Sequence, residues 1–453
     1  MFKPPSRAGG SARPAAALRA AALCLALSLG APAAQAEPPL LTLRQALREA
    51  LAGNPGLADL RRRAEALAQV PVQAGTLPDP RLHLNAMNLP VDTFALSQEA
   101  MTQLQVGISQ ALPFPGKLAL REAVARHRAE AAAAQVEELR LGLARDVRLV
   151  WWNLFYLDRA LEILQRNRGL LRQFVSVARS KYEVGKGLQQ DVLLAELELS
   201  RLLDEELALR ELRRREEARL DALLGRQALE PVRLPEEVLA GLPAPPDPRE
   251  LLAEALGARP LLAVRRAELE AARSALALAR RDRLPDFQVA AAYGYRRDAP
   301  GGRSRADFLS LMFSMSLPLR ADRRQDRAVD ERAARLAEAR ERLAEARLAV
   351  QREIAQALAD LRRAREQARL VRTGIIPQAR QTVGSMLAGY QVSQVDFLNL
   401  VRAQVTLFRY ETRYWKAFAE AQQALARLQA AAGREPLPRT SRRGRDHVEE
   451  PRS

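Results

Sequence analysis

Cysteine and histidine, the residue types that most often bind metals or carry redox chemistry, are scarce in this chain. There is one cysteine, Cys24, and there are three histidines, His83, His127 and His447. A metal site needs several ligands that converge on one ion, but these histidines fall in an expected strand, an expected long helix and a polar tail. We therefore predict no resident metal and no cofactor.

Catalytic arrangements are equally hard to assign. The sequence contains no Gly-rich phosphate loop, no nucleophile elbow and no pair of carboxylates with catalytic spacing. The chain is thus predicted not to be an enzyme, and its function must follow from its architecture.

The first 36 residues have the features of a signal peptide. They hold four basic residues and no acidic one, followed by the apolar run Ala20–Leu29 and the small-x-small sequence Ala34-Gln35-Ala36. The run is about ten residues long, too short for the roughly 20 that a membrane-spanning helix requires. We expect cleavage before Glu37, which would remove Cys24 and leave a chain without thiols, suited to an oxidising periplasm.

The formal net charge is +17, and it falls to +13 when the four basic residues of residues 1–36 are removed. Arg and Glu alternate along the same segments, for example Arg335–Arg347, as is typical of solvated helix faces. A nucleic-acid partner would require the charge to gather in one patch with aromatic residues, so we predict none. No run of about 18 uncharged apolar residues follows residue 37, and a membrane crossing would therefore have to use strands.

The mature chain repeats itself. Residues 43–225 and 249–433 follow the same order of segments at an offset of about 205 to 208. Leu77-Pro78-Asp79 returns as Leu284-Pro285-Asp286, and Tyr182–Ala195 returns as Tyr390–Ala403. The expected organisation is a signal peptide (1–36), a first repeat (37–233), a Pro-rich connector (234–248), a second repeat (249–433) and a disordered tail (434–453).

Each repeat contains long stretches with helical periodicity. Apolar residues step by three and four in the first repeat at Val136, Leu139, Leu143, Val147, Val150, Leu154, Leu157, Leu161 and Leu164. A second apolar-periodic run follows the Gly185-Lys186-Gly187 turn, which predicts an antiparallel coiled-coil hairpin with its tip at about residues 183–190. The matching tip in the second repeat is expected at about 389–396, and Pro377 should kink the helix that precedes it.

Two segments in each repeat alternate apolar with small or polar residues, which predicts strands at about 81–90, 102–112, 286–296 and 308–318. About 9 to 11 residues of such alternation suits a tilted strand that crosses an outer membrane. A soluble antiparallel sheet with one wet face would show the same alternation. Four strands cannot close a barrel around water, so the membrane interpretation requires several copies of the chain.

This order of elements, a helix, two strands and a long helical hairpin repeated behind a signal peptide, resembles the TolC outer-membrane efflux family over nearly the whole mature chain. Asn54-Pro55 after the opening helix and the paired segments Tyr182–Ala195 and Tyr390–Ala403 carry the resemblance. Segment Ile108–Lys117 looks like the strand-to-helix junction of the branch that exports cobalt, zinc, cadmium, copper or silver.

The resemblance implies a mainly α-helical homotrimer whose twelve strands, four from each chain, form one membrane β-barrel above a periplasmic α-helical barrel. It implies an outer-membrane location in contact with lipid, with most of the mass in the periplasm. The implied partners are a periplasmic adaptor (membrane fusion) protein and an inner-membrane RND transporter. The implied function is that of a passive exit duct for heavy-metal cations, without catalytic residues.

The same family often places acidic residues nine and twelve positions after the tyrosine of the second hairpin tip, where they constrict the pore. Here those positions hold Asn399 and Arg402, which puts a cation-attracting gate at this level in doubt. The resemblance makes the following residues candidates for lining a gate: Tyr390, Asp396, Asn399, Arg402 and Asp191. The alternative that they only complete a coiled-coil turn stays open.

The exposed ends of the two hairpins are candidates for docking of the adaptor, because one hairpin end can meet another end-to-end. The candidate residues are Val184, Gly185, Lys186, Gly187, Leu188, Val392 and Ser393. The glycines would serve a tight turn in any case.

Two alternatives remain at the level of sequence. The same fold could carry drugs or type I secreted proteins, because the transporter chooses the cargo. A periplasmic coiled-coil adaptor or scaffold would also be exported, helical and basic, but it would lack duplicated strands of membrane length.

Overall fold

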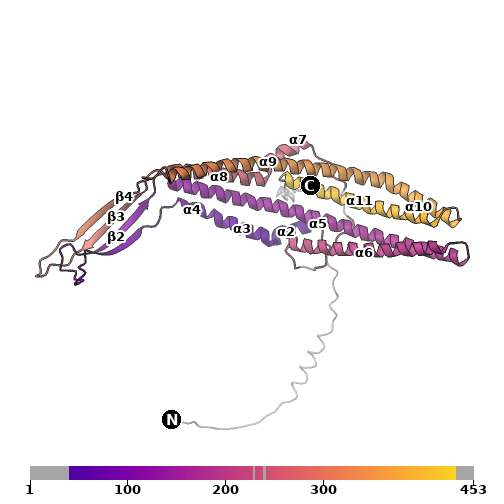
Figure 1. Cartoon of the computed structure of the whole chain (residues 1–453), viewed down its shortest axis with the longest axis horizontal. Helices are drawn as coiled ribbons and strands as arrows, with labels where there is room; N and C mark the ends of the chain where they lie inside the picture. The colour runs from indigo at the N-terminus through magenta and orange to yellow at the C-terminus, as the bar shows by residue number, and fades with distance from the viewer. Residues whose placement is uncertain (1–39, 228–229, 238–240, 435–453) are drawn as a thin grey trace, which may run out of the picture.

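The computed structural model describes residues 40–227, 230–237 and 241–434, so the expected signal peptide and almost all of the expected tail lie outside the described residues. Long helices run side by side along the molecule, and a small sheet stands at one end (Figure 1). The prediction of a mainly helical fold with a small sheet is confirmed.

The first repeat contains three short helices before its sheet strands and two long helices after them. These are α2 (Leu43–Gly53), α3 (Pro55–Ala68), α4 (Val70–Gly75), α5 (Lys117–Glu183) and α6 (Gln189–Leu224). Thr42 and Gln45 form a reciprocal capping box that begins α2, and the side chain of Asn54 caps α3 ahead of Pro55. Helix α5 has 67 residues and spans on the order of 100 Å at 1.5 Å per residue.

The second repeat follows the same course with α7 (Pro248–Ala258), α8 (Pro260–Arg281), α9 (Gln325–Leu370), α10 (Ile376–Gln391) and α11 (Phe397–Ala431). The disturbance expected at Pro377 takes the form of a π-helical segment, η1 (Val371–Ile375), which ends two residues before the proline. Proline lacks the amide donor and its ring crowds the carbonyl four residues earlier, here that of Thr373, and the wider turn gives this carbonyl room.

Four antiparallel strands form one sheet in the order β1-β2-β3-β4: β1 (Arg81–Met87), β2 (Gln103–Leu112), β3 (Phe287–Tyr295) and β4 (Phe308–Met315). The two repeats are joined by β2 and β3, where Gly107 lies opposite Ala292. A Cβ atom on Gly107 would lie 2.8 Å from that of Ala292, so glycine is required for this close pairing. Strand β1 ends earlier than expected because Asn88 adopts a left-handed conformation, with φ of 52°.

The helices form one layer. In the half of the layer near the sheet, the order of helices from one edge to the other is α9, α8, α5 and the α3/α4 pair. In the half away from the sheet, the order is α9, α11, α5 and α6. Trp151 and Trp152 are both buried where α5 meets α2 and α11, and the indole of Trp151 donates a 3.0 Å hydrogen bond to the carbonyl of Leu41. Helix α2 therefore lies against the face of α5 that carries Trp151.

The segment Phe114–Lys117, between β2 and α5, ties the two repeats together where sheet meets helices. The buried ammonium of Lys117 lies 2.9 Å from Asp286 and 3.5 Å from Asp282, and it donates a 2.9 Å hydrogen bond to the carbonyl of Leu284. The amide of Phe114 donates a 2.8 Å hydrogen bond to Asp286. Lys117 is the last residue of the junction motif noted in the sequence.

Across the described ranges, no helix combines the length and the apolar character that crossing a membrane would require.

Candidate functional site at the hairpin tips

The two hairpins end in turns of the same backbone pattern. In the first, the amides of Gly185 and Lys186 donate to the carbonyls of Tyr182 and Lys181, at 3.0 and 2.8 Å. The second turn repeats both bonds at positions 208 residues later. The amide of Ser393 donates to the carbonyl of Tyr390 at 3.1 Å, and the amide of Gln394 donates to the carbonyl of Gly389 at 2.9 Å. Gly185 and Ser393 both have a positive φ, of 70° and 62°. The second turn thus places a non-glycine residue in a conformation that favours glycine.

Lys181 connects the two tips. Its ammonium donates to the backbone carbonyl of Tyr390 at 2.5 Å and to the hydroxyl of Ser393 at 3.1 Å. It also lies 4.3 Å from the centre of the Tyr390 ring, within the range of a cation–π interaction. At the tips, a single side chain of the first hairpin therefore makes three contacts with the second, in addition to the apolar core between the hairpins.

Tyr390 lies in the apolar core between the hairpins. It is 4 % exposed, and its ring centre is 5.2 Å from that of Phe397. Its hydroxyl has no hydrogen-bond partner among the described residues. Burial, together with the nearby Asp191 carboxylate, raises the pKa of the Tyr390 hydroxyl above its ordinary value.

Asp191 and Asp396 come close enough to influence each other. Burial raises the pKa of the half-buried Asp191 above its ordinary value, the like charge of Asp396 raises it further, and the Lys181 ammonium opposes both effects. Asp396 itself is exposed and precedes the first residue of α11. The structure therefore gathers Lys181, Asp191, Tyr390 and Asp396 at one end of the molecule.

The other predicted tip residues lie on the surface of the chain. Asn399 and Arg402 are both exposed, three residues apart on α11. Val184, Leu188 and Val392 are the apolar candidates for docking, and they are 66 %, 59 % and 65 % exposed. The remaining docking candidates, Gly185, Lys186, Gly187 and Ser393, lie in the same two turns.

Metal-ligating side chains do not gather in the described part of the chain, where no three His, Cys, Asp or Glu residues could hold one ion. His83 lies 2.7 Å from the hydroxyl of Ser109, and His127 lies 2.9 Å from Glu130. His447 falls outside the described residues.

The family model of the outer membrane efflux protein matches residues 46–226 and 251–434, which cover both repeats. The chain belongs to the outer membrane efflux protein family. This efflux protein is 24 % identical over 407 residues to the cobalt-zinc-cadmium resistance protein CzcC of Cupriavidus metallidurans, a match that covers 87 % of this chain and 90 % of CzcC.

Solved channels share the fold of this efflux protein. The outer membrane protein VceC of Vibrio cholerae superimposes with a TM-score of 0.73 at 19 % identity, covering 86 % of this chain and 96 % of VceC. CusC, whose structures concern transmembrane channel formation, does so with a TM-score of 0.74 at 16 % identity, covering 87 % and 92 %. The outer-membrane channel OprN also gives a TM-score of 0.74, at 19 % identity over 87 % of this chain and 90 % of OprN.

This efflux protein is accordingly an outer-membrane channel protein with a large periplasmic portion, and its family is one of channels and not of enzymes. The alternative of a periplasmic adaptor or scaffold is set aside. Sequence reasoning missed Lys181, the residue that joins the tips. A difference between the two repeats was a signal for it. The position of the second repeat that matches Lys181 is Gly389, which has no side chain, so only the first repeat can make this contact between the tips.

Proposed function

We propose that this efflux protein is the exit-duct subunit of a tripartite efflux system for heavy-metal cations. It works as a homotrimer and docks to a periplasmic adaptor that links it to an inner-membrane RND transporter. The observation that carries the proposal is that the single chain leaves both its sheet and its helix layer open at their edges. The energy for transport comes from the partners, since the chain itself provides only a passage.

The open sheet edges support assembly with further copies. Strands β1 and β4 each have a neighbour on one side only, so their outer backbone groups lack strand partners within the described sheet. Leu82 and Leu84 on β1 and Leu309 and Leu311 on β4 are 69 %, 75 %, 71 % and 79 % exposed. Apolar side chains on a sheet face suit contact with lipid, but unpaired backbone groups at an open edge do not. Pairing β4 of one copy with β1 of the next would satisfy those backbone groups.

The helix layer is open in the same way. Helix α6 at one edge exposes Leu193, Leu197, Leu203 and Leu207, at 57 %, 48 %, 43 % and 67 %. These leucines extend along one helix and are more than singly scattered surface residues. A neighbouring copy that presents the end of its α9, which includes the 61 % exposed Leu370, and its α10 would cover them.

The cargo is proposed from the relative named for cobalt, zinc and cadmium resistance, which this chain matches over 407 residues. The junction motif ending at Lys117 points the same way. Passage of drugs or secreted proteins through the same fold is the alternative. The tip residues Val184–Leu188 and Val392–Ser393 are the proposed surface for the adaptor, and Tyr390, Asp191, Asp396, Asn399 and Arg402 are proposed to form the gate.

Assembly is tested by replacing one exposed leucine of α6. The purified wild-type protein should run as a trimer on an unheated denaturing gel and as a monomer after heating. Leu207→Lys should abolish the trimer band, because it buries a charge in the proposed contact. Glu211→Gln on the same helix, where the carboxylate makes a surface ion pair with Arg215, should leave the band unchanged. A wild-type protein that is monomeric in both lanes would contradict the homotrimer.

Cargo is tested by deleting the gene and measuring growth on cobalt, zinc and cadmium salts. Sensitivity that wild-type protein reverses, and that Leu207→Lys does not, would support a metal duct. Unchanged metal tolerance together with new sensitivity to drugs would contradict a metal cargo and support the passage of drugs.

A further inference from the structure

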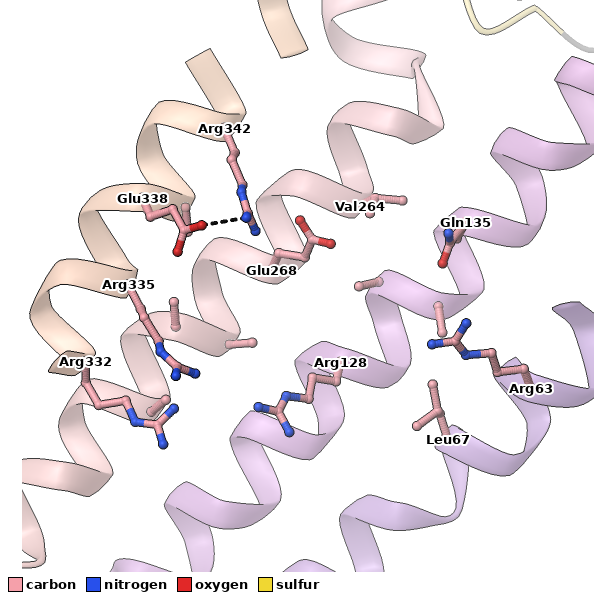
Figure 2. A pocket seen from close by; sticks show the side chains of 16 residues that line it. Arg63, Leu67, Arg128, Gln135, Val264, Glu268, Arg332, Arg335, Glu338 and Arg342 are labelled. Carbon is pink, nitrogen blue, oxygen red and sulfur yellow. Dashed lines mark ion pairs between the residues drawn. The ribbon is translucent and has the colours of Figure 1, made fainter. Parts of the chain in front are cut away.

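A cavity of about 560 Å³ lies across four helices of the layer, close to the sheet end. Its floor is made of small residues, including the buried Ala131, Ala132 and Ala271. Long side chains from α3, α5, α8 and α9 stand around this floor (Figure 2). We call this cavity the arginine groove, because five of its lining residues are Arg63, Arg128, Arg332, Arg335 and Arg342.

The positive charge of the arginine groove exceeds its internal compensation. Only two acids line it, Glu268 and Glu338. Glu338 is paired with Arg342 at 2.5 Å, and Glu268 is paired at 2.8 Å with Arg265, which lies outside the groove. Each of the two carboxylates therefore already has an arginine partner, and neither forms an ion pair with a second arginine of the groove lining.

Arg335 is paired at 2.6 Å with Glu331, which also lies outside the groove lining. Three of the five arginines thus remain without an ion-pair partner in the part of the chain that the structure describes: Arg63, Arg128 and Arg332. They come from three different helices. Figure 2 shows Arg332 and Arg335 extending from α9 over the groove, while Arg128 extends from α5 toward them and Arg63 points from α3 toward Arg128. Guanidinium groups that converge from several directions offer planar, multiple hydrogen bonds to an oxyanion.

The groove lies on the face of the layer opposite to α2. Arg128 and Trp151 both lie on α5. At 3.6 residues per turn, the directions in which their side chains leave the helix axis differ by roughly 140°. Trp151 faces Leu41 and the α2 side. On this face the groove extends across four helices of the layer.

We propose that the arginine groove is an anion-binding site for oxyanions of the phosphate class, and that it makes the channel wall attract anions at this level. The anion site is a property of the single chain. Its position in the lumen rests on the trimeric channel proposed above. Three copies would place nine unpaired arginines around the passage, so a cation crossing this level would do so next to bound anions that screen the positive charge.

The site is tested by isothermal titration of the detergent-purified full-length protein with inorganic pyrophosphate at low ionic strength. Wild-type protein should bind, and Arg128→Gln combined with Arg332→Gln should weaken binding at least about ten-fold, because each charged hydrogen bond contributes strongly to an anion complex. Arg62→Gln is the matched control, since Arg62 is an exposed arginine of α3 paired with Glu65 and absent from the groove lining.

Equal binding by the wild-type protein and the double variant, or no binding by the wild-type protein, would overturn the anion site. Retention of the trimer band by the variants shows that loss of binding does not reflect misfolding. A loss that also occurs in Arg62→Gln would mean that pyrophosphate responds to general surface charge, and it too would overturn the site.

The lumen position is tested by the reversal potential of the channel in planar bilayers under a potassium chloride gradient. Arg128→Glu combined with Arg332→Glu should shift the reversal potential toward cation selectivity. A conducting channel whose reversal potential does not move would overturn the lumen position. Absence of any conductance would count against the proposed channel function, while the titration still decides the anion site.

Discussion

The ammonium of Lys181 reaches the backbone carbonyl of Tyr390 at a distance of 2.5 Å, and this contact joins two hairpins that lie more than 200 positions apart in sequence. Separation of the hairpins would break this bond, the bond to Ser393 and the contact with the tyrosine ring. The tips are thus joined by contacts of one side chain, in addition to the apolar core between the hairpins, and these contacts can break without unfolding either helix pair.

Replacement of this side chain should loosen the tips. Lys181→Met keeps the apolar stem but removes the charge, and we expect it to lower the free energy of separating the tips by about 1 kcal/mol, since Lys181 is only partly buried. The open population should rise about five-fold. Single-channel recording should show longer or more frequent openings. Lys186→Met, at an exposed position in the same turn, should behave like the wild type, and equal gating of both variants would refute the role of Lys181.

The pH response of the tip should depend on Asp191. The pKa of Asp191 is raised in the folded protein, so ionisation of its carboxyl destabilises the folded tip. The tip loses this part of its stability as the pH rises from the ordinary pKa of 3.8 through the raised value. The tip should therefore be most firmly closed in acid. Asp191→Asn should remove this part of the pH dependence and tighten the tip at neutral pH. Channel openings recorded in acidic and neutral buffer check this, and an unchanged pH profile in the variant would contradict it. Asp396→Asn, which removes the secondary cause, should give a smaller change in the same direction.

The hydroxyl of Tyr390 should be dispensable for folding, although its ring is not. Tyr390→Phe removes a buried hydroxyl that has no partner in the described part of the chain and keeps the ring beside Lys181, so stability should change by no more than about 0.5 kcal/mol or rise slightly. Tyr390→Ala should destabilise the tip by about 3 kcal/mol through lost packing with Phe397. Hydrogen exchange of tip amides measures both effects. A large loss of protection in Tyr390→Phe would reveal a function for the hydroxyl.

The junction between sheet and helices should depend on Lys117. Lys117→Met leaves Asp286 and Asp282 without their buried cation and should destabilise the chain by about 2 to 3 kcal/mol, because the carboxylates are partly solvated. The amount of heat-sensitive trimer in the outer membrane should fall. Adding Asp286→Asn should restore part of it by removing the uncompensated charge. Lys416→Met, at an exposed position on α11, is the control, and a normal trimer yield from Lys117→Met would disprove the structural role.

Periodicity along the chain was enough to predict most of the elements. The apolar spacing around Leu154 predicted the long helices, and the alternation around Leu84 and Leu311 predicted strands at both places in the repeat. The glycine-containing turn after Tyr182 located the first tip, and its likeness to the segment after Tyr390 located the second. These predictions succeed because helix, strand and turn preferences are read from neighbouring residues.

The contacts between distant segments were determined by the tertiary structure alone. The pairing of Gly107 with Ala292, the ion pairs of Lys117 and the contact from Lys181 to Tyr390 all depend on how the two repeats pack. The arginine groove likewise brings together Arg63, Arg128 and Arg332 from three helices. Sequence periodicity shows which face of a helix is apolar, but it does not show which helix that face meets or at what register. Packing of the whole layer fixes both, and so determines where the unpaired charges gather.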